Sequence, residues 1–356
     1  MLALTKPVVV YALNAGSSSL KVAAFRCALH DEEPLGEHEQ DMSSGQLSPA
    51  LDAALESLRS RGVDAPSAIG HRVVHGGPDR WRPSLIDESV LADVETAAMF
   101  APRHQPASLA AIAVSATTFP RLPQVACFDT AFHHDLPLVA RTLPIPAEAG
   151  SVRRYGFHGL SYEWAVSSLG DALGERAVIA HLGSGASLAA VRNGRCVDTT
   201  MGLTPIGGLM MSTRSGDVDP GALVHVMREH GLDADGLERL VEDESGLRGV
   251  SGSTGDMREL LDVRSRDARA ALAVELWCMT VRKQIGALAA VLGGIDSLVF
   301  TGGIGERSAE LRGEICEGLE HLGVGTGAVS VHVVASDENR IVARHTAAVV
   351  RQMSGS

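Results

Sequence analysis

The feature that most constrains the fold is a strand, polar turn and strand pattern that occurs once in each half of the chain. In the first half, the apolar run Val8 to Leu13 leads into the turn Asn14 to Ser19 and a second run, Leu20 to Phe25. In the second half, Ala177 to Val191 repeats this pattern around Gly183 to Ser187. The repetition predicts a duplicated α/β domain whose two polar turns face a cleft suited to a polyphosphate. Two unrelated hairpins are the simpler alternative.

The remaining segments alternate between helical and strand patterns, which indicates an α/β architecture. Apolar spacing and end signals predict helices at 49–61, 87–100, 106–117, 161–173, 220–230, 266–292 and 338–352, and strands at 68–74, 124–128 and 297–301. The proline-rich stretch Leu136 to Pro146 is the best boundary signal. We therefore expect an N-terminal domain of residues 1–135 plus the terminal helix 339–356, and a second, nucleotide-binding domain of residues 136–338.

Composition excludes several classes of protein. The 356 residues are 45% hydrophobic with no apolar run long enough to span a membrane, and five dispersed cysteines form no CxxC pair. We expect a cytoplasmic protein without a disulfide framework, a zinc site or a membrane span. The net charge of -12 disfavours nucleic acid as a partner. With only three lysines and no Gly-Lys pair, the chain has no P-loop.

Polar residues interrupt several apolar segments at positions suited to binding anions. The turn Asn14 to Ser19 offers backbone N–H groups and hydroxyls near Lys21, although an ordinary solvated turn has the same composition. Arg72 stands at the end of a strand, where a buried charge needs a partner. That partner is either a bound carboxylate or phosphate held by the guanidinium fork, or an internal salt bridge.

Three further positions are candidates for chemistry. Asp129 directly follows a strand, the usual place for site residues in an open α/β sheet. His158 lies between glycines and aromatics, where a structural turn is the alternative, and Arg214 lies in a Gly/Ser-rich loop before a helix. The loops at 253–258 and 301–307 are rich enough in glycine to let a nucleotide approach the backbone.

Taken in order, seven motifs resemble the acetokinase family, whose members phosphorylate acetate. The resemblance spans nearly the whole chain and is carried by Asn14 to Lys21, His71 to Gly77, Phe128 to His133, Tyr155 to Gly159, His181 to Gly183, Thr213 to Pro220 and Gly302 to Glu306. It implies the actin, Hsp70 and sugar-kinase superfold of duplicated ribonuclease-H-like domains, a homodimer, ATP as co-substrate and Mg²⁺, with Mn²⁺ as an alternative metal.

The resemblance also implies roles for individual residues. Asn14 and Glu338 would hold the metal, and Asp129, His158 and Arg214 would be catalytic. The carboxylate substrate would contact Arg72, Val74, Phe157 and Pro205. The nucleotide would contact Ser17, Ser19, Lys21, His181, Leu182, Gly183, Ser184, Gly185, Asp256, Met257, Arg258, Gly303, Ile304, Gly305, Glu306 and Arg307.

The chain departs from the family pattern at several places that bear on specificity. Arg103 replaces a leucine that lines the acyl pocket, so an inward side chain would favour a more polar or dicarboxylic substrate. Ser184 and Arg307 each replace an asparagine near the nucleotide, and a shorter connection before Val331 weakens the assignment of Glu338. Leu160 and Tyr162 stand where Thr and His are common, and Asn339 replaces a glutamate.

These observations predict an acetate kinase that transfers a phosphoryl group reversibly from ATP to acetate, giving acetyl phosphate and ADP. We favour Asp129 as an orienter of an arginine or of metal-bound water, because the acceptor carboxylate is already ionised at neutral pH and needs no general base. A kinase for propionate, butyrate or another short carboxylate, and a pyrophosphate-using relative, are alternatives within the same class. A non-catalytic ATP-binding module is the alternative from a different class.

Overall fold

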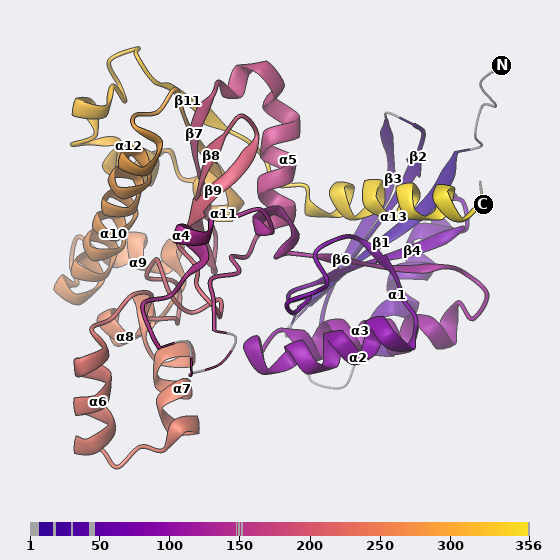
Figure 1. Cartoon of the computed structure of the whole chain (residues 1–356), viewed down its shortest axis with the longest axis horizontal. Helices are drawn as coiled ribbons and strands as arrows, with labels where there is room; N and C mark the ends of the chain where they lie inside the picture. Colours follow the sequence, from indigo (N-terminus) through magenta and orange to yellow (C-terminus); the bar gives the residue numbers. More distant parts are fainter. Residues whose placement is uncertain are drawn as a thin grey trace. The chain divides into compact units, whose positions relative to one another are not determined.

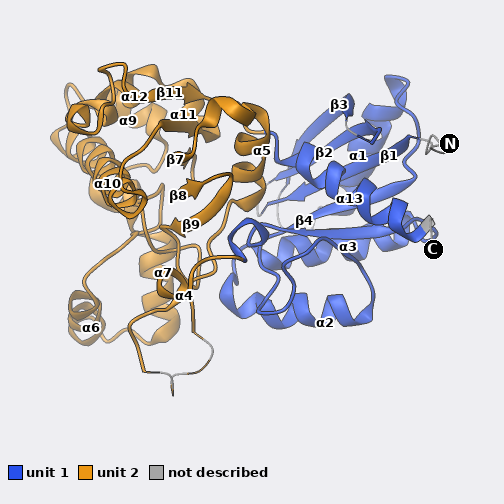
Figure 2. Cartoon of the chain, turned by 45° about the horizontal axis from the view of Figure 1, so that its top comes forward, with its two compact units in different colours: residues 1–134, 337–356 blue, residues 135–336 orange. Residues whose placement is uncertain are grey.

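The chain forms two compact units. The computed structural model describes residues 7–16, 19–29, 31–42, 47–146, 148, 150 and 152–354. Contacts divide the chain into unit 1, residues 1–134 with 337–356, and unit 2, residues 135–336 (Figure 2). The boundaries expected from the sequence, after residues 135 and 338, fall beside these limits. That each unit is an independently folding domain stays a prediction.

Unit 1 is built on one mixed sheet whose strand order is β3-β2-β1-β4-β6-β5. Strands β1, β2 and β3 are antiparallel neighbours, whereas β4 and β6 run parallel to β1. The elements of unit 1 are β1 Val8–Ala15, β2 Ser19–Cys27, β3 Glu32–Asp41, α1 Leu47–Ser60, β4 Ala68–Val73, β5 Ser84–Leu85, α2 Glu88–Ala97, η1 Ala98–Phe100, α3 Gln105–Thr118, β6 Gln124–Phe128, η2 Ala131–His133 and α13 Glu338–Ser354 (Figure 1).

Helices cover both faces of this sheet, as an α/β fold requires. On one face, Tyr11 and Leu13 of β1 pack with Leu51 and Leu58 of α1 in a core that also includes Ala111 of α3. On the other face, α13 lies against β1, β2, β4 and β6 (Figure 1). Residue 14 alternates with residues 13 and 15 and therefore belongs to the face that α13 covers. That face carries the candidate site of unit 1.

Unit 2 repeats the strand arrangement of unit 1. Its sheet has the order β11-β10-β7-β8-β9, in which β7, β8 and β9 are antiparallel neighbours and β10 and β11 run parallel to β7. In both units, therefore, an antiparallel three-strand meander is extended on the side of its first strand by two parallel strands. This match confirms the duplication that the two polar turns predicted.

Outside its sheet, unit 2 is mostly helical. The elements of unit 2 are α4 Leu138–Arg141, α5 Gly159–Leu169, η4 Gly170–Leu173, β7 Arg176–Leu182, β8 Ala186–Arg192, β9 Arg195–Thr199, α6 Pro220–Glu229, α7 Ala234–Asp243, α8 Gly246–Ser251, α9 Met257–Val263, α10 Ala268–Leu292, β10 Ser297–Thr301, α11 Gly302–Arg307, α12 Ala309–Cys316, η5 Glu320–Leu322 and β11 Ser330–Val333. The stretch 302–307, expected as a loop, is the helix α11, because it continues directly from β10 with a tight turn at Gly302.

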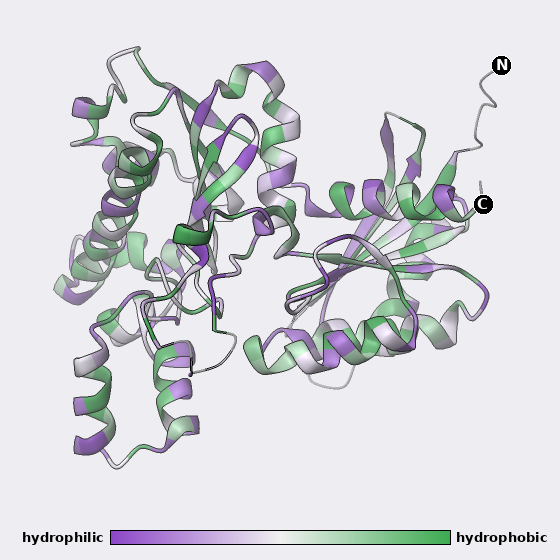
Figure 3. Cartoon of the chain, in the orientation of Figure 1, coloured by the Kyte–Doolittle hydropathy of each residue, from purple (hydrophilic) through white to green (hydrophobic). Residues whose placement is uncertain are grey.

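The longest helix, α10, ends at a glycine in the left-handed conformation. Gly293 follows Leu292 with a φ of 72°, and its N–H bonds back to Ala289 and Ala290 in the usual glycine C-cap arrangement. In the described part of the chain, no helix is long and apolar enough to cross a membrane, and Figure 3 shows polar residues distributed along α10.

Candidate active site

Four predicted site residues of unit 1 join in one polar cluster. The Arg72 guanidinium donates from Nε to both oxygens of Asp129 at 3.0 Å and from Nη2 to Oδ2 at 2.6 Å. Its Nη1 donates to Asn14 Oδ1 at 3.2 Å and lies 3.3 Å from Glu338 Oε2. Asn14 Nδ2 in turn donates to Glu338 Oε2 at 3.3 Å. The cluster therefore links residues predicted for the substrate, the catalytic position and the metal.

The topology explains why these distant positions meet. Asn14 and Arg72 lie near the carboxyl ends of β1 and β4, and Asp129 follows β6 with its N–H bonded to Val73 O at 2.9 Å. Because β1, β4 and β6 are parallel neighbours, their carboxyl ends share one edge of the sheet. Glu338, the first residue of α13, completes the cluster.

Close packing of α13 depends on a glycine in β4. A Cβ atom on Gly70 would clash with Thr346 Oγ1 and would lie 2.7 Å from Val342 Cγ1. Only a residue without a side chain lets the helix approach the sheet this closely. The glycine thus helps to hold the helix whose first residue is Glu338.

The electrostatics of the cluster favour a permanently charged arginine. Burial alone would lower the pKa of Arg72, but the carboxylates of Asp129 and Glu338 outweigh burial, so the pKa lies above its usual value. The Asp129 side chain is 1% exposed, that of Glu338 13% and that of Arg72 22%. Arg72 therefore stays partly exposed, although each of its guanidinium nitrogens has a partner within the cluster. The internal salt bridge that was one of the two alternatives for Arg72 is present.

The other predicted residues of unit 1 lie around this cluster. Lys21 pairs with Asn14 across β1 and β2, and its Nζ lies 3.0 Å from Glu37 Oε2. Ser19 begins β2, and the half-buried Val74 follows β4 directly. Ser17 lies outside the described residues.

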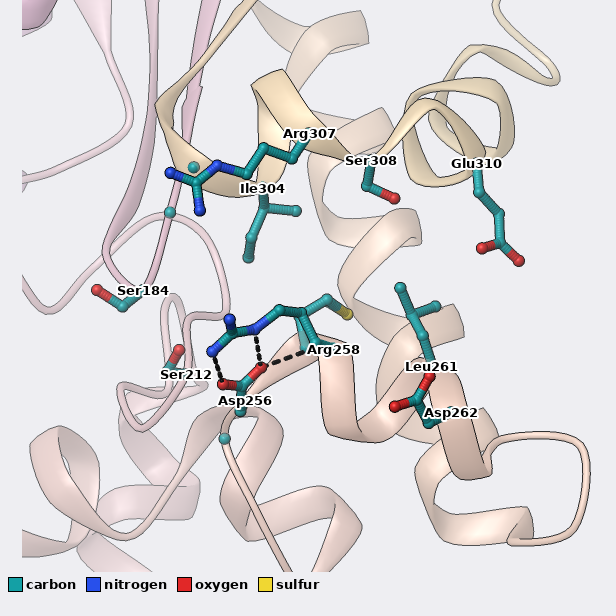
Figure 4. Close-up of a pocket in the computed structure, with 14 residues that line it drawn as sticks. Ser184, Ser212, Asp256, Arg258, Leu261, Asp262, Ile304, Arg307, Ser308 and Glu310 are labelled. Carbon is teal, nitrogen blue, oxygen red and sulfur yellow. Dashed lines mark hydrogen bonds and ion pairs between the residues drawn. The ribbon is translucent and has the colours of Figure 1, made fainter. Parts of the chain in front are cut away.

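Unit 2 holds a cavity of about 520 Å³ that contains eight of the predicted nucleotide residues. This volume is within the range of pockets for small ligands. The predicted residues in its lining are Gly183, Ser184, Asp256, Met257, Arg258, Gly303, Ile304 and Arg307, and the lining also includes Ser212, Gly255, Leu261, Asp262, Ser308 and Glu310 (Figure 4).

One part of the cavity wall is apolar and another is polar. Met257, Leu261 and Ile304 supply apolar surface from α9 and α11, which suits a flat ring system. Ser184 supplies a hydroxyl, and the Ser212 N–H donates to Ser184 O at 3.1 Å, which fixes the two loops to each other. Arg258 is held by Asp256 through bonds of 3.1 and 2.6 Å, as the dashed lines in Figure 4 show.

Glycines let the backbone segments around this cavity approach one another closely. Gly302 has a φ of 77°, and a Cβ atom there would lie 2.8 Å from Leu182 O. A residue with a side chain would therefore push α11 away from the end of β7. Leu182 and Gly305 are buried and are absent from the cavity lining, and Glu306 accepts a hydrogen bond from Ser336 N at 2.8 Å. These predicted nucleotide residues belong to the framework rather than the lining.

His158 and His181, the two predicted site histidines of unit 2, are stacked on each other and hydrogen-bonded to neighbouring serines. The rings of His158 and His181 lie 4.3 Å apart, centroid to centroid, with 22° between their planes. His158 Nδ1 lies 2.8 Å from Ser187 Oγ on β8, and His181 Nδ1 lies 2.8 Å from Ser161 Oγ on α5. His158 itself has a left-handed φ of 58° immediately before α5, which is unusual for a residue other than glycine. The stack and the left-handed turn give His158 one fixed orientation.

Arg214 approaches the same place as His158. A Cβ atom on Gly185 would lie 3.3 Å from His158 Nε2 and 3.5 Å from Arg214 Nη1. The same Nη1 donates to Pro205 O at 3.0 Å, and Phe157, next to His158, is buried. Burial lowers the pKa of Arg214 against the opposing effect of Glu242 and Asp243, but an arginine stays charged at any physiological pH.

Sequence reasoning did not assign roles to the two serines that hold the histidines, and it missed four residues of the cavity lining. Ser161 and Ser187 are both 0% exposed, yet isolated serines carry no pattern in a sequence. Leu261, Asp262, Ser308 and Glu310 lie one to four residues beyond the predicted segments, which end at Arg258 and Arg307. The helical period of 3.6 residues, applied forward from Met257, would have pointed to Leu261.

Comparison with known proteins gives one consistent family. The model of the acetokinase family matches residues 9–353. A curated acetate kinase from Nitrobacter hamburgensis is 38% identical, covering 98% of this chain and 97% of its own length. A curated acetate kinase from Rhodopseudomonas palustris is 45% identical, covering 78% of this chain and 76% of its own length.

Solved structures agree with these relatives. Acetate kinase from Porphyromonas gingivalis has a TM-score of 0.83 at 34% identity, covering 96% of this chain and all of its own. A propionate kinase from Francisella tularensis has a TM-score of 0.87 at 30% identity, covering 96% of this chain and 99% of its own. A hexokinase of the ROK group from Thermus thermophilus, with a TM-score of 0.50 at 15% identity, is a likeness of fold alone. The predicted actin, Hsp70 and sugar-kinase fold is confirmed, and the chain belongs to the acetokinase family.

Proposed function

We propose that this protein is an acetate kinase that uses ATP and Mg²⁺ to form acetyl phosphate reversibly. The observation that carries the proposal is the joining of Asn14, Arg72, Asp129 and Glu338 into one cluster, in a chain of the acetokinase family. Arg72 keeps 22% of its side-chain surface exposed, and it is suited to a carboxylate because a guanidinium binds carboxylate oxygens through paired hydrogen bonds.

Phosphoryl transfer to acetate is mainly a problem of charge. The acceptor is already an anion, so the protein must bring two anions together and then stabilise the charge on the equatorial phosphoryl oxygens. Arg72 would bind the acceptor, and Arg214 with His158 would stabilise the transferring group. Asp129 would orient Arg72, because its carboxylate accepts three hydrogen bonds from that side chain.

The cluster of unit 1 has the chemistry of a magnesium site. Asn14 and Glu338 offer hard oxygen ligands, which Mg²⁺ prefers, and Mg²⁺ is commonly held by one or two carboxylates plus substrate phosphates. In the described part of the chain, no three His, Cys, Asp or Glu side chains form a ready metal cage. The pair Asn14 and Glu338 supplies only part of a coordination shell, which fits a metal that arrives with the nucleotide phosphates. Bound there, Mg²⁺ would neutralise phosphate charge.

The cavity of unit 2 favours a nucleotide over pyrophosphate as the phosphoryl donor. Pyrophosphate has no apolar part, whereas Met257, Leu261 and Ile304 give the cavity apolar surface beyond its glycine loops. We assign this surface to the adenine ring and the Ser184 side to the phosphates.

Propionate is the second candidate acceptor, and the TM-score of 0.87 to a propionate kinase favours it. The curated relatives at 38 and 45% identity are acetate kinases, which is why acetate comes first. Arg103 is exposed on the turn before α3, an outward position that leaves room for a small apolar acyl group.

The test is hydroxamate trapping of acyl phosphate from ATP and Mg²⁺ with acetate, propionate, butyrate or succinate, in wild type and Arg103→Leu. Turnover of acetate above the others supports the proposal, and succinate turnover that Arg103→Leu removes would make Arg103 a substrate residue. Bound ATP without any acyl phosphate would move the protein to the non-catalytic class.

We further propose a cytoplasmic homodimer. The five cysteines are free thiols, and four of them are buried, as suits a reducing compartment. The exposed apolar side chains Leu272 and Met279, seven residues apart on one face of α10, offer a surface for a second copy. Light scattering at several protein concentrations tests the dimer, and a mass of one chain at all of them would exclude it.

A further inference from the structure

A buried chain of hydroxyl groups ends on His158. Tyr162 OH lies 2.5 Å from Ser187 Oγ, and Ser187 Oγ lies 2.8 Å from His158 Nδ1. The side chains of Tyr162 and Ser187 are both 0% exposed. Tyr162 N bonds to His158 O at 3.1 Å, so these two residues stand one helical turn apart and converge on the same serine.

The chemistry of the three groups gives this chain a preferred direction. A phenol is a stronger donor and a weaker acceptor than an aliphatic hydroxyl, and a neutral imidazole nitrogen is the best acceptor of the three. The favoured order therefore has Tyr162 donating to Ser187 and Ser187 donating to Nδ1 of His158. Burial raises the pKa of Tyr162 despite the opposing effect of its hydrogen bond with Ser187, so the phenol keeps its proton. Aligned donors strengthen one another in such a chain.

A hydrogen bond accepted at Nδ1 leaves the imidazole proton on Nε2. That nitrogen is the one that faces Gly185, where a Cβ atom would lie 3.3 Å from it and 3.5 Å from Arg214 Nη1. The hydrogen on Nε2 and the Arg214 guanidinium would thus meet the same oxygen-rich group beside the bare backbone of Gly185.

We propose that Tyr162 and Ser187 are positioning residues that hold neutral His158 as the Nε2–H tautomer, so that it donates to an oxygen of the transferring phosphoryl group. This inference rests on the proposed function for the identity of the group that receives the hydrogen bond. No proton moves in the step; His158 only donates. A tyrosine at position 162, where the family commonly has histidine, supplies a donor that does not change protonation near neutral pH.

The neighbouring histidine provides a matched control. His181 Nδ1 is bonded to Ser161 Oγ at 2.8 Å, the same distance as in the His158 pair, and the two rings are stacked. Ser161→Ala therefore removes one buried serine hydroxyl from the same stack without touching Ser187. Its effect should fall on His181, a predicted nucleotide residue, and not on the tautomer of His158.

The test combines long-range ¹H–¹⁵N spectra of the imidazoles with steady-state kinetics. The signal of His158 among the 14 histidines is identified by its loss in His158→Asn. We expect the Nε2–H pattern in wild type and in Ser161→Ala, and a mixture of tautomers in Tyr162→Phe and Ser187→Ala. For Tyr162→Phe, kcat should fall about tenfold, the scale of one lost positioning hydrogen bond, while KM for ATP changes little. Ser161→Ala should instead raise KM for ATP.

Two results would overturn the inference: an Nδ1–H pattern in wild type, or an unchanged Nε2–H pattern in both Tyr162→Phe and Ser187→Ala. Tyr162→Phe keeps the aromatic ring and removes only the donor that orients the Ser187 hydroxyl toward His158 Nδ1. If Ser187→Ala does not fold, an unchanged Nε2–H pattern in Tyr162→Phe alone overturns the inference. The spectra require no turnover. Failure of the proposed function would appear as absence of acyl phosphate in wild type, whatever the tautomer.

Discussion

Arg72→Ala tests whether the cluster of unit 1 is held together by its ion pair. The substitution removes three hydrogen bonds from Asp129, whose carboxylate is 1% exposed. Taking one partner from a buried pair costs about 3–5 kcal/mol. Since Arg72 is itself 22% exposed, we take the lower end, about 3 kcal/mol.

The companion substitution Asp129→Asn should reduce the free energy of unfolding by less than Arg72→Ala does. The amide keeps an oxygen that can accept from Arg72 and carries no charge, so we expect a loss of about 2 kcal/mol. In the double variant Arg72→Ala with Asp129→Asn, no charge is left at position 129, and only Glu338 loses its charged partner. The loss of stability of the double variant should therefore be smaller than the sum of the losses of the two single variants by about 1–3 kcal/mol.

Scanning calorimetry measures these differences. For a unit of this size, 1 kcal/mol corresponds to about 2–4 °C in Tm, so Arg72→Ala should lower the Tm of the transition of unit 1 by on the order of 10 °C. Arg72→Lys is the control, because it keeps the charge and loses the fork. A Tm for Arg72→Ala within about 1 °C of wild type, or strict additivity in the double variant, would refute the reasoning.

Three further predictions concern single residues. Arg307 lines the cavity and, in the described part of the chain, forms no ion pair, so Arg307→Asn should raise KM for ATP about tenfold with little change in Tm, measured by kinetics and calorimetry. Gly185→Ala places a methyl group 3.3 Å from His158 Nε2 and should lower kcat about 10- to 100-fold while KM for acetate is kept; an unchanged kcat would contradict the assigned position of the phosphoryl group. Burial lowers the pKa of His71 to about 4 although its bond to Gln124 opposes this, so only the unfolded chain takes up the proton as pH falls from 6.5 to 4. The neutral, buried His71 thus contributes about 3 kcal/mol to the free energy of unfolding at any pH above 6.5, and this contribution should vanish toward pH 4. The urea midpoint of His71→Gln should therefore depend less on pH than that of wild type.

The strands that carry strong apolar patterns were predictable from the sequence. The predicted strand 124–128 coincides with β6, and 297–301 with β10. Strand β3 was missed because its ten residues, Glu32–Asp41, are mostly charged or polar. It pairs on one side only, at the sheet edge, where polar side chains discourage pairing with another chain. Its structure comes from pairing with β2 rather than from its own composition.

The site was predictable as a set of residue types but not as a geometry. Asp129 stood out because it directly follows a strand, yet its three hydrogen bonds with Arg72 depend on the parallel pairing of β4 with β6. Glu338 is 324 residues from Asn14 in the chain, and no local pattern relates the two. Long-range pairing of this kind is set by topology, which single-sequence patterns do not contain.

The discontinuity of unit 1 has a consequence for the order of events during protein synthesis. Strands β1 to β6 leave the ribosome first, but α13, which covers one face of their sheet, follows only after about 200 residues of unit 2. At about 5–20 residues per second, that sheet face waits on the order of 10–40 s for its helix. All the residues that line the cavity of unit 2, up to Glu310, are made within this interval, whereas the cluster around Arg72 lacks Glu338 until α13 emerges. A chain truncated after residue 336 should therefore be able to form the nucleotide cavity but not the complete acceptor site.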